Sequence, residues 1–149
     1  MAKAPDGPRR VEPCEHGAIW AAGTAHVEQL QKLGRAWAKH VDPHHIMKQI
    51  VTGQVNAFVY GDYLVVFDIG GTWTSPGVKL FEEMLTLRLN TYTNAGSYRQ
   101  VVWCMESLAR ANGCVGVLLG TVGGYDDRLG RVIERLGYEK AGGSYYKEV

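Results

Sequence analysis

Two neighbouring stretches of the sequence decide the fold: VKLFEEMLTLRLN at residues 78–90 and SYRQVVWCMESLARANGCVGVLLGTV at residues 97–122. The first alternates apolar and polar residues, which predicts a strand. In the second, apolar residues at helical spacing follow Ser97 and Gln100, a capping-box pair, and Gly113 ends the helix. The β-branched run after this glycine predicts a buried parallel strand. Strand, helix and parallel strand together predict a crossover unit.

The alternation of the first strand slips at one place. Leu85, Leu87 and Leu89 alternate cleanly with polar residues, but one residue too many intervenes around Glu82 and Glu83. We interpret this slip as a β-bulge, which inserts one extra residue into a strand. The two carboxylates at the bulge are then expected to point to opposite faces of the sheet.

A hairpin precedes this strand. Residues 55–60 and 63–69 are rich in β-branched and aromatic residues, and Gly61-Asp62 between them is typical of a two-residue turn. Three antiparallel strands followed by the crossover predict an α+β fold with a mixed sheet.

Two helices are expected before the hairpin, after an N-terminal arm. Residues 25–41 carry apolar residues at three- and four-residue steps, with Thr24 as N-cap, and Asp42-Pro43 starts a second helix. The Pro/Gly-rich residues 1–23 predict an arm, in which residues 18–21 form a strand or a packed segment. The expected domain therefore comprises residues 24–149.

The C-terminal region contains a last helix and a short tail. Asp126 is the expected N-cap, Ile133 lies on the apolar face, and the tail forms a hairpin-like piece around Gly142-Gly143. Strands this short leave a sheet edge unpaired. We expect the N-terminal arm or a second copy of the chain to cover this edge, with Trp20 buried there.

The composition excludes several classes of protein. The chain has 149 residues, 46% of them hydrophobic and 21% charged, and a net charge of +1. These values fit one globular domain and argue against disorder and against a generic binder of nucleic acid or anionic membranes. No apolar run is long enough to span a membrane, and the first ten residues do not read as a signal peptide. Three cysteines without a CxxC pair favour a reducing compartment, so we expect a cytoplasmic protein.

The order of elements resembles that of the GCN5-related N-acetyltransferase (GNAT) superfamily. Two strings carry the resemblance: SLARANGCVGVLL, similar to the family's helix tail and central parallel strand, and DDRLGRVIERLGYEKAGGSYYK, similar to its final helix and strand. The resemblance covers residues 25–149 and implies an acetyltransferase that uses acetyl-CoA and an amine of a small molecule or protein.

The resemblance also implies a pyrophosphate-binding loop at the N-terminus of the helix after Ser97. The family's pattern Q/R-x-x-G-x-G/A falls on residues 93–98, where Gly96 matches, but Thr93 replaces Gln or Arg and Tyr98 replaces the last small residue. The residues implied to contact the cofactor are Leu87, Leu89, Thr93, Asn94, Ala95, Gly96, Ser97, Tyr98 and Asp126.

The implied acid and base depart from the family in different ways. The family's tyrosine acid, seven residues after the start of the last helix, corresponds to Ile133, which cannot donate a proton. Tyr125 is the candidate acid in its place, with Tyr92, Tyr98 and Tyr138 as alternatives. The family's base is a carboxylate on the bulged strand, which here means Glu82 or Glu83. The alternative, which is the more common case, is that each tyrosine merely packs with its hydroxyl at the surface and that each glutamate is a solvated surface charge.

Two functions remain open at this stage. One is an acyl-CoA-dependent N-acetyltransferase, and the other is a catalytically inactive GNAT-fold protein that binds or assembles with a partner. The departures at Thr93, Tyr98 and Ile133 resemble those in small bacteriophage-encoded GNAT-like proteins, which would place the chain in a host cytoplasm or virion. His40, Asp42, His44 and His45 cluster in the sequence, but the break at Pro43 keeps His40 and His44 off one helical face and argues against a metal site.

Overall fold

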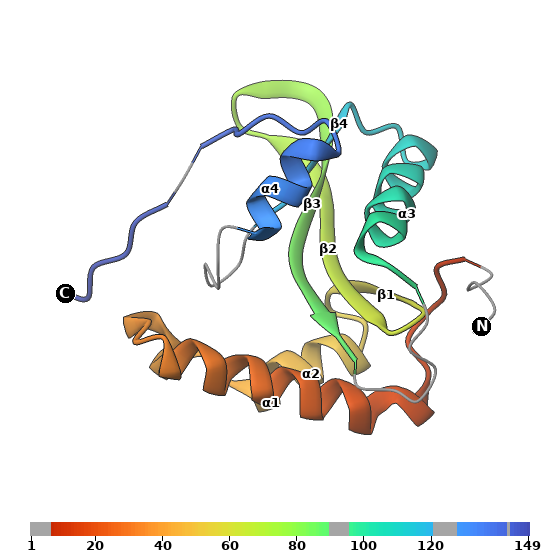
Figure 1. Cartoon of the computed structure of the whole chain (residues 1–149). Helices are drawn as coiled ribbons and strands as arrows, with labels where there is room; N and C mark the ends of the chain where they lie inside the picture. The colour runs from red at the N-terminus through yellow and green to blue at the C-terminus, as the bar shows by residue number, and fades with distance from the viewer. Residues whose placement is uncertain (1–6, 90–95, 121–127, 143) are drawn as a thin grey trace.

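A four-stranded mixed sheet forms the centre of the computed structural model, which describes residues 7–89, 96–120, 128–142 and 144–149 (Figure 1). The strand order is β1-β2-β3-β4, antiparallel between the first three and parallel between β3 and β4. The predicted α+β crossover topology is confirmed. In chain order the elements are η1 (Pro13–Glu15), α1 (His16–Lys32), η2 (Ala36–His40), α2 (Pro43–Val51), β1 (Asn56–Tyr60), β2 (Tyr63–Thr72), β3 (Ser75–Arg88), α3 (Tyr98–Ala111), β4 (Gly116–Leu118) and α4 (Arg128–Arg135).

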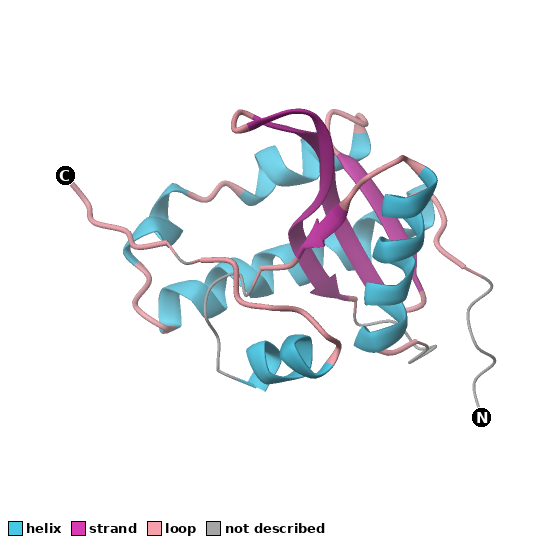
Figure 2. Cartoon of the chain, turned by 90° about the horizontal axis from the view of Figure 1, so that it is seen from above, coloured by secondary structure: helices cyan, strands magenta, loops and turns pink. Residues whose placement is uncertain are grey.

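Helices cover both faces of the sheet (Figures 1 and 2). The face covered by α1 and α2 holds one buried cluster, and the face covered by α3 holds a second. The members of the first are Ile19, Ile50, Val59, Leu64, Val66, Leu87 and Leu89. The members of the second are Phe58, Tyr60, Val65, Phe81, Val101, Val102, Cys104, Met105 and Ala109. The sheet thus separates an aliphatic layer from a more aromatic one.

The predicted β-bulge is confirmed. Val66 of β2 pairs with Leu85 of β3, whereas the next residue, Phe67, pairs with Glu83, so Met84 is the extra residue. An extra residue exchanges the faces to which side chains point. Phe81 accordingly packs in the α3 layer, while Leu87 packs in the α1/α2 layer although both have odd numbers. The bulge lets one strand supply apolar side chains to both layers.

The N-terminal region differs from the expectation. α1 begins at His16, inside the predicted arm, so residues 18–21 are helical rather than a strand, and Thr24 lies within the helix instead of capping it. η1, with Pro13 in its first turn and a Glu12–Glu15 capping box, leads into the helix. The glycines of this segment do not break the helix, because an isolated helical glycine costs only about 1 kcal/mol. The helix ends before Gly34, whose φ is 69°.

Both ends of the chain also bear on the predicted covering of the sheet edge. Arg9 forms an isolated antiparallel bridge to Val59, so the N-terminal segment covers the β1 edge, opposite to the one expected. The described residues after Gly137 contain no strand, which corrects the expected hairpin-like piece. The tail instead reaches η2, where Glu148 contacts Lys39 and His40 at 3.1 and 2.9 Å. Trp20 is half-buried against His44 and not at a sheet edge. A homodimer remains a prediction.

Candidate functional site

The site forms where β3 and β4 diverge. The two strands pair through three positions, of which the last joins Glu82 to Leu118. β3 then continues to Arg88 with β2 on one side, and among the described residues no strand lies on its other side. Beyond this pair, β3 and the described residues after β4 form no further strand pairing, and we call the region between them the wedge.

The side chain of Glu83 enters this wedge. Its residue is only 7% exposed, and the bulge at Met84 begins directly after it. Oε1 accepts a hydrogen bond from the Gly120 backbone N–H at 3.0 Å, and Oε2 accepts one from the Thr86 hydroxyl at 2.5 Å. The carboxylate thus joins β3 to the segment after β4 at the point where their backbones separate.

Burial gives Glu83 an unusual titration. Desolvation raises its pKa above the ordinary value, and the hydrogen bonds from Thr86 and Gly120 only partly oppose this effect. No ion pair involving Glu83 occurs within the described ranges. A carboxylate in this environment binds a proton more readily than a surface carboxylate, which suits a general base working near neutral pH.

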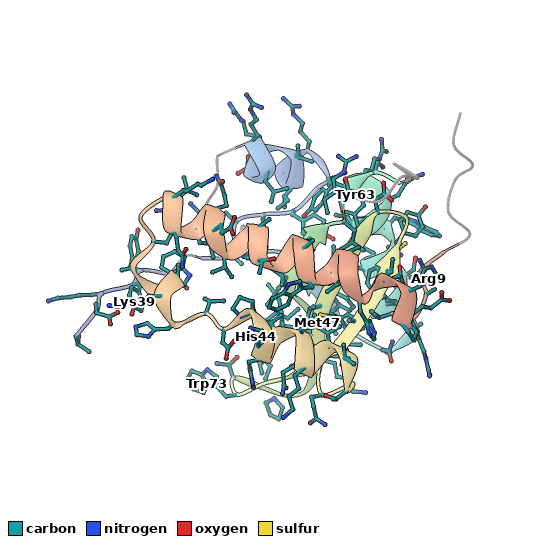
Figure 3. All side chains as sticks on the ribbon, turned by 90° about the horizontal axis from the view of Figure 1, so that it is seen from below. Arg9, Lys39, His44, Met47, Tyr63 and Trp73 are labelled. Atoms are coloured by element: carbon teal, nitrogen blue, oxygen red, sulfur yellow. The ribbon has the colours of Figure 1, made fainter. Side chains whose placement is uncertain are left out.

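Three tyrosine side chains pack on the side of the sheet covered by α3. Tyr98, Tyr138 and Tyr63 all pack against the α3 layer, and Figure 3 places Tyr63 on the side of the molecule away from α2. The Tyr138 hydroxyl donates to Glu106 at 2.9 Å. Burial raises the pKa of Tyr98 and of Tyr138, and the charge of Glu83 adds to the increase at both. Both phenols therefore stay protonated at neutral pH.

The N-terminus of α3 borders the same region. Its capping box is formed as predicted: the Gln100 side chain accepts from the Ser97 N–H at 2.9 Å, and the Gln100 N–H donates to Ser97 Oγ at 3.3 Å. Gly96 has a φ of 87°, a conformation that favours glycine. Since the box engages two donors, the first-turn N–H groups of Tyr98 and Arg99 are the ones without intrahelical partners.

The site residues predicted from the sequence differ in their burial and in whether the structure describes them. Glu83 is buried in the wedge, whereas Glu82 is exposed on β3 beside β4. Leu87 is buried, as is Leu89, and both pack in the α1/α2 layer, so only their backbones are available to a ligand in the wedge. Ile133 is a buried apolar residue of α4. The candidates that lie outside the described residues are Tyr92, Thr93, Asn94, Ala95, Tyr125 and Asp126.

Sequence reasoning missed two partners of Glu83. Thr86 follows the carboxylate by three residues and returns to the same face because the bulge intervenes. That spacing could have been predicted once the bulge was placed. The Gly120 N–H comes from a glycine-rich stretch, and no pattern in the sequence pairs it with Glu83.

Other features of the described residues lie away from the wedge. A shallow hollow of about 300 Å³ between α1 and α2 is lined by Trp20, His44, Met47, Lys48, Val51 and Thr52. Figure 3 shows His44 and Met47 on α2, and Trp73 at the margin of the molecule. Asp42 caps α2 by accepting from the His44 N–H at 2.9 Å. Among the residues that the structure describes, no group of three metal-binding side chains occurs, and no helix is long and apolar enough to cross a bilayer.

Comparisons with known proteins address the fold. No protein-family model matches the sequence, and no curated protein matches it either. The BH1408 protein of Bacillus halodurans, in its tetramutant form, has a similar structure at 15% identity, with a TM-score of 0.67 over 95% of this chain and 99% of that one. An acetyltransferase of the GNAT family from Listeria monocytogenes superposes with a TM-score of 0.57 at 14% identity over 92% and 88% of the two chains.

AAC(6')-Iy, solved in complex with the bisubstrate analog CoA-S-monomethyl-acetylneamine, has a TM-score of 0.59 at 12% identity over 95% of this chain and 96% of that one. These comparisons cover 92–95% of this chain. The identities are too low to transfer residue roles, so the superpositions address the fold alone. The chain therefore has the GNAT acetyltransferase fold.

Proposed function

We propose that this protein is an acyl-CoA-dependent N-acetyltransferase that acts on an amine of a small molecule or a protein. The observation that carries the proposal is the buried Glu83 carboxylate, held where β3 and β4 diverge in a GNAT fold. Two solved structures with this fold are an acetyltransferase and a complex with a CoA-containing bisubstrate analog. The alternative of an inactive assembly protein of bacteriophage origin gains no support from these structures.

The residues at the N-terminus of α3 are compatible with an acyl-CoA. Gly96 carries no side chain that would crowd a phosphate, and the Tyr98 and Arg99 N–H groups lie at the positive end of the helix dipole. Leu87 on β3 would contribute backbone groups, and Leu89, which follows the end of β3, would contribute its carbonyl, since its N–H donates to the Asp62 carbonyl oxygen. Acetyl-CoA supplies the acetyl group as a thioester, whose C–S bond breaks with its electron pair leaving on sulfur as the C–N bond to the amine forms.

Glu83 is the proposed general base. An amine must lose a proton to become an amide, and a Glu83 oxygen receives this proton directly or through water. Each carboxylate oxygen can accept a second hydrogen bond in addition to the one from Gly120 or Thr86. Because burial raises the pKa of Glu83, this carboxylate accepts the proton more readily than an ordinary surface carboxylate does.

Calorimetry with acetyl-CoA, followed by thiol release in the presence of a panel of amines, tests the proposal. Glu83→Gln should lower turnover by about 10²–10⁴-fold while the affinity for CoA is kept. Glu82→Gln is the matched control and should change turnover by less than about twofold, since Glu82 is exposed. Absence of acetyl-CoA binding by the wild-type protein would refute the proposed function, and an active Glu83→Gln variant would refute the assigned base.

A further inference from the structure

A cavity of about 260 Å³ lies between the last turns of α3, the start of β4 and the segment after α4, away from α1 and α2 (Figure 1). This volume suits a molecule smaller than a drug-sized ligand. Neither Glu83 nor its partners Thr86 and Gly120 line the cavity. Its α3 residues lie about 12–18 Å along the helix axis from the first residue of α3. The cavity is therefore separate from the wedge.

One wall of the cavity is apolar. Ala109 of α3, Val117 of β4 and Leu136, which follows α4, contribute to it. All three also pack in the buried cluster under α3. Because side chains in a close-packed core keep their positions, this wall is preformed and can receive an aliphatic group.

Two opposite charges line the same cavity without neutralising each other. Glu106 and Arg110 are four residues apart on α3, a spacing at which opposite charges commonly pair. No ion pair within the described ranges involves either of them. Glu106 accepts the Tyr138 hydroxyl at Oε2, at 2.9 Å, so its carboxylate is held in place while Oε1 stays available.

The Tyr138 hydroxyl shows that the two charges are close to one point. Burial raises the pKa of Tyr138, the hydrogen bond to Glu106 adds to the increase, and the charge of Arg110 opposes it. The phenol thus lies within electrostatic reach of both charges. A small molecule in the cavity can therefore contact the carboxylate and the guanidinium together.

We infer that this cavity binds a free amino acid with an apolar side chain. The carboxylate of the amino acid pairs with the Arg110 guanidinium, whose planar fork can donate to both oxygens. Its ammonium donates to Glu106, and its side chain packs on the apolar wall. A zwitterion satisfies both charges, whereas a simple anion is repelled by Glu106 and a simple cation by Arg110. This inference does not depend on the proposed acetyl transfer.

Calorimetry with L-leucine as the probe, without acetyl-CoA, tests the inference. The wild type should bind L-leucine. N-acetyl-L-leucine lacks the ammonium and L-leucinamide lacks the carboxylate, so each should bind about tenfold or more weakly, because one charge-assisted hydrogen bond is lost. These derivatives also imitate the ends of a peptide, which present one charge only.

Variants of the two charged residues assign the binding to this cavity. Arg110→Gln and Glu106→Gln should each weaken L-leucine binding by about tenfold or more. The glutamine at position 106 still offers the Tyr138 hydroxyl an acceptor, so the fold is kept. Arg131→Gln and Glu134→Gln are matched controls on exposed positions of α4 outside the cavity, and they should leave the affinity unchanged.

A free thiol gives a second, local measurement. Cys114 lines the cavity and is partly exposed, whereas Cys14 is an exposed cysteine in η1. Bound L-leucine should slow the alkylation of Cys114 by iodoacetamide and leave that of Cys14 unchanged. Mass spectrometry of the digested protein measures both cysteines in one sample.

The outcomes separate this inference from the proposed function. It is overturned by a wild type that does not bind L-leucine, by binding that neither charge variant weakens, or by Cys114 labelling that L-leucine does not slow. Equal affinity for L-leucine and for a derivative without one charge would overturn the assignment of a zwitterion. None of these measurements involves acetyl-CoA, so the proposed function is tested apart from them.

Discussion

The two faces of the sheet are built from different kinds of side chain. The cluster under α1 and α2 consists of isoleucine, valine and leucine, whereas the layer under α3 includes tyrosines, a cysteine and a methionine. Glu83 points to the α3 side, where Thr86 and Tyr98 lie. Aliphatic packing stabilises a fold without demanding hydrogen bonds, whereas each buried polar group requires a partner.

This difference indicates a division of labour between the layers. The α1/α2 layer stabilises the fold, whereas the α3 layer contains the buried polar groups of the site, which lower the stability of the fold. β3 serves both layers because the bulge at Met84 changes the face to which its side chains point. The predictions below test this division, from the largest expected effect to the smallest.

Deletion of Met84 should have the largest effect. Without the extra residue, the side chains before and after position 84 can no longer both keep their faces of the sheet. Either Leu85, Leu87 and Leu89 would point away from the α1/α2 layer, or Glu83 would point away from the wedge. Several buried side chains would be misplaced together, and we expect a protein that fails to fold cooperatively. Circular dichroism during heating measures the cooperativity of unfolding, and size-exclusion chromatography shows whether the variant is compact.

Met84→Ala is the control for the deletion. The Met84 side chain is 47% exposed, so its truncation should cost less than about 1 kcal/mol while the backbone register is kept. A deletion variant with the melting temperature of Met84→Ala would show that the bulge does not divide the two layers.

Leu64→Ala should produce the second largest effect, confined to stability. Leu64 is fully buried in the α1/α2 layer, and truncation of such a leucine costs about 2–5 kcal/mol. At a temperature where the variant is folded, its affinity for acetyl-CoA should equal that of the wild type. Denaturant unfolding and calorimetry test both parts, with the more exposed Leu33→Ala as control. A folded Leu64→Ala variant that no longer binds acetyl-CoA would contradict the division between a stabilising layer and a layer that holds the site.

Gln100→Ala should have a smaller effect of about 1 kcal/mol, because it removes half of the capping box of α3. The same change frees the Ser97 N–H, which Gln100 engages at 2.9 Å. The affinity for CoA should therefore increase or stay the same while the melting temperature falls. Reduced affinity at unchanged stability would mean that Gln100 itself contacts the ligand.

The smallest expected effect concerns pH. Burial raises the folded-state pKa of Glu83 above its ordinary value of 4.5, so the folded state prefers the protonated side chain. The stability that this preference contributes is complete below pH 4.5 and is lost as the pH rises through the folded-state pKa. The melting temperature of the wild type minus that of Glu83→Gln should therefore decrease between pH 4.5 and 8. An increase would mean that the bonds from Thr86 and Gly120 outweigh burial.

Several elements were predictable from the sequence because their signals are local. The turn at Gly61-Asp62, the capping box of α3 and the glycine after that helix depend on residues within one or two turns of each other. The start of α1 was missed for the opposite reason. Its two glycines disfavour a helix locally, and burial of Ile19 against the sheet stabilises the helix through them.

The sequence by itself determined the bulge and the pair of glutamates beside it, because a break in a two-residue period is visible without any other part of the chain. Only the tertiary structure decided that Glu83, and not Glu82, is buried, that Gly120 donates to it, and that the Tyr98 hydroxyl is buried without a partner among the described residues. These relations join residues on β3, on α3 and after β4. Their meeting depends on where two parallel strands part, which no local preference encodes.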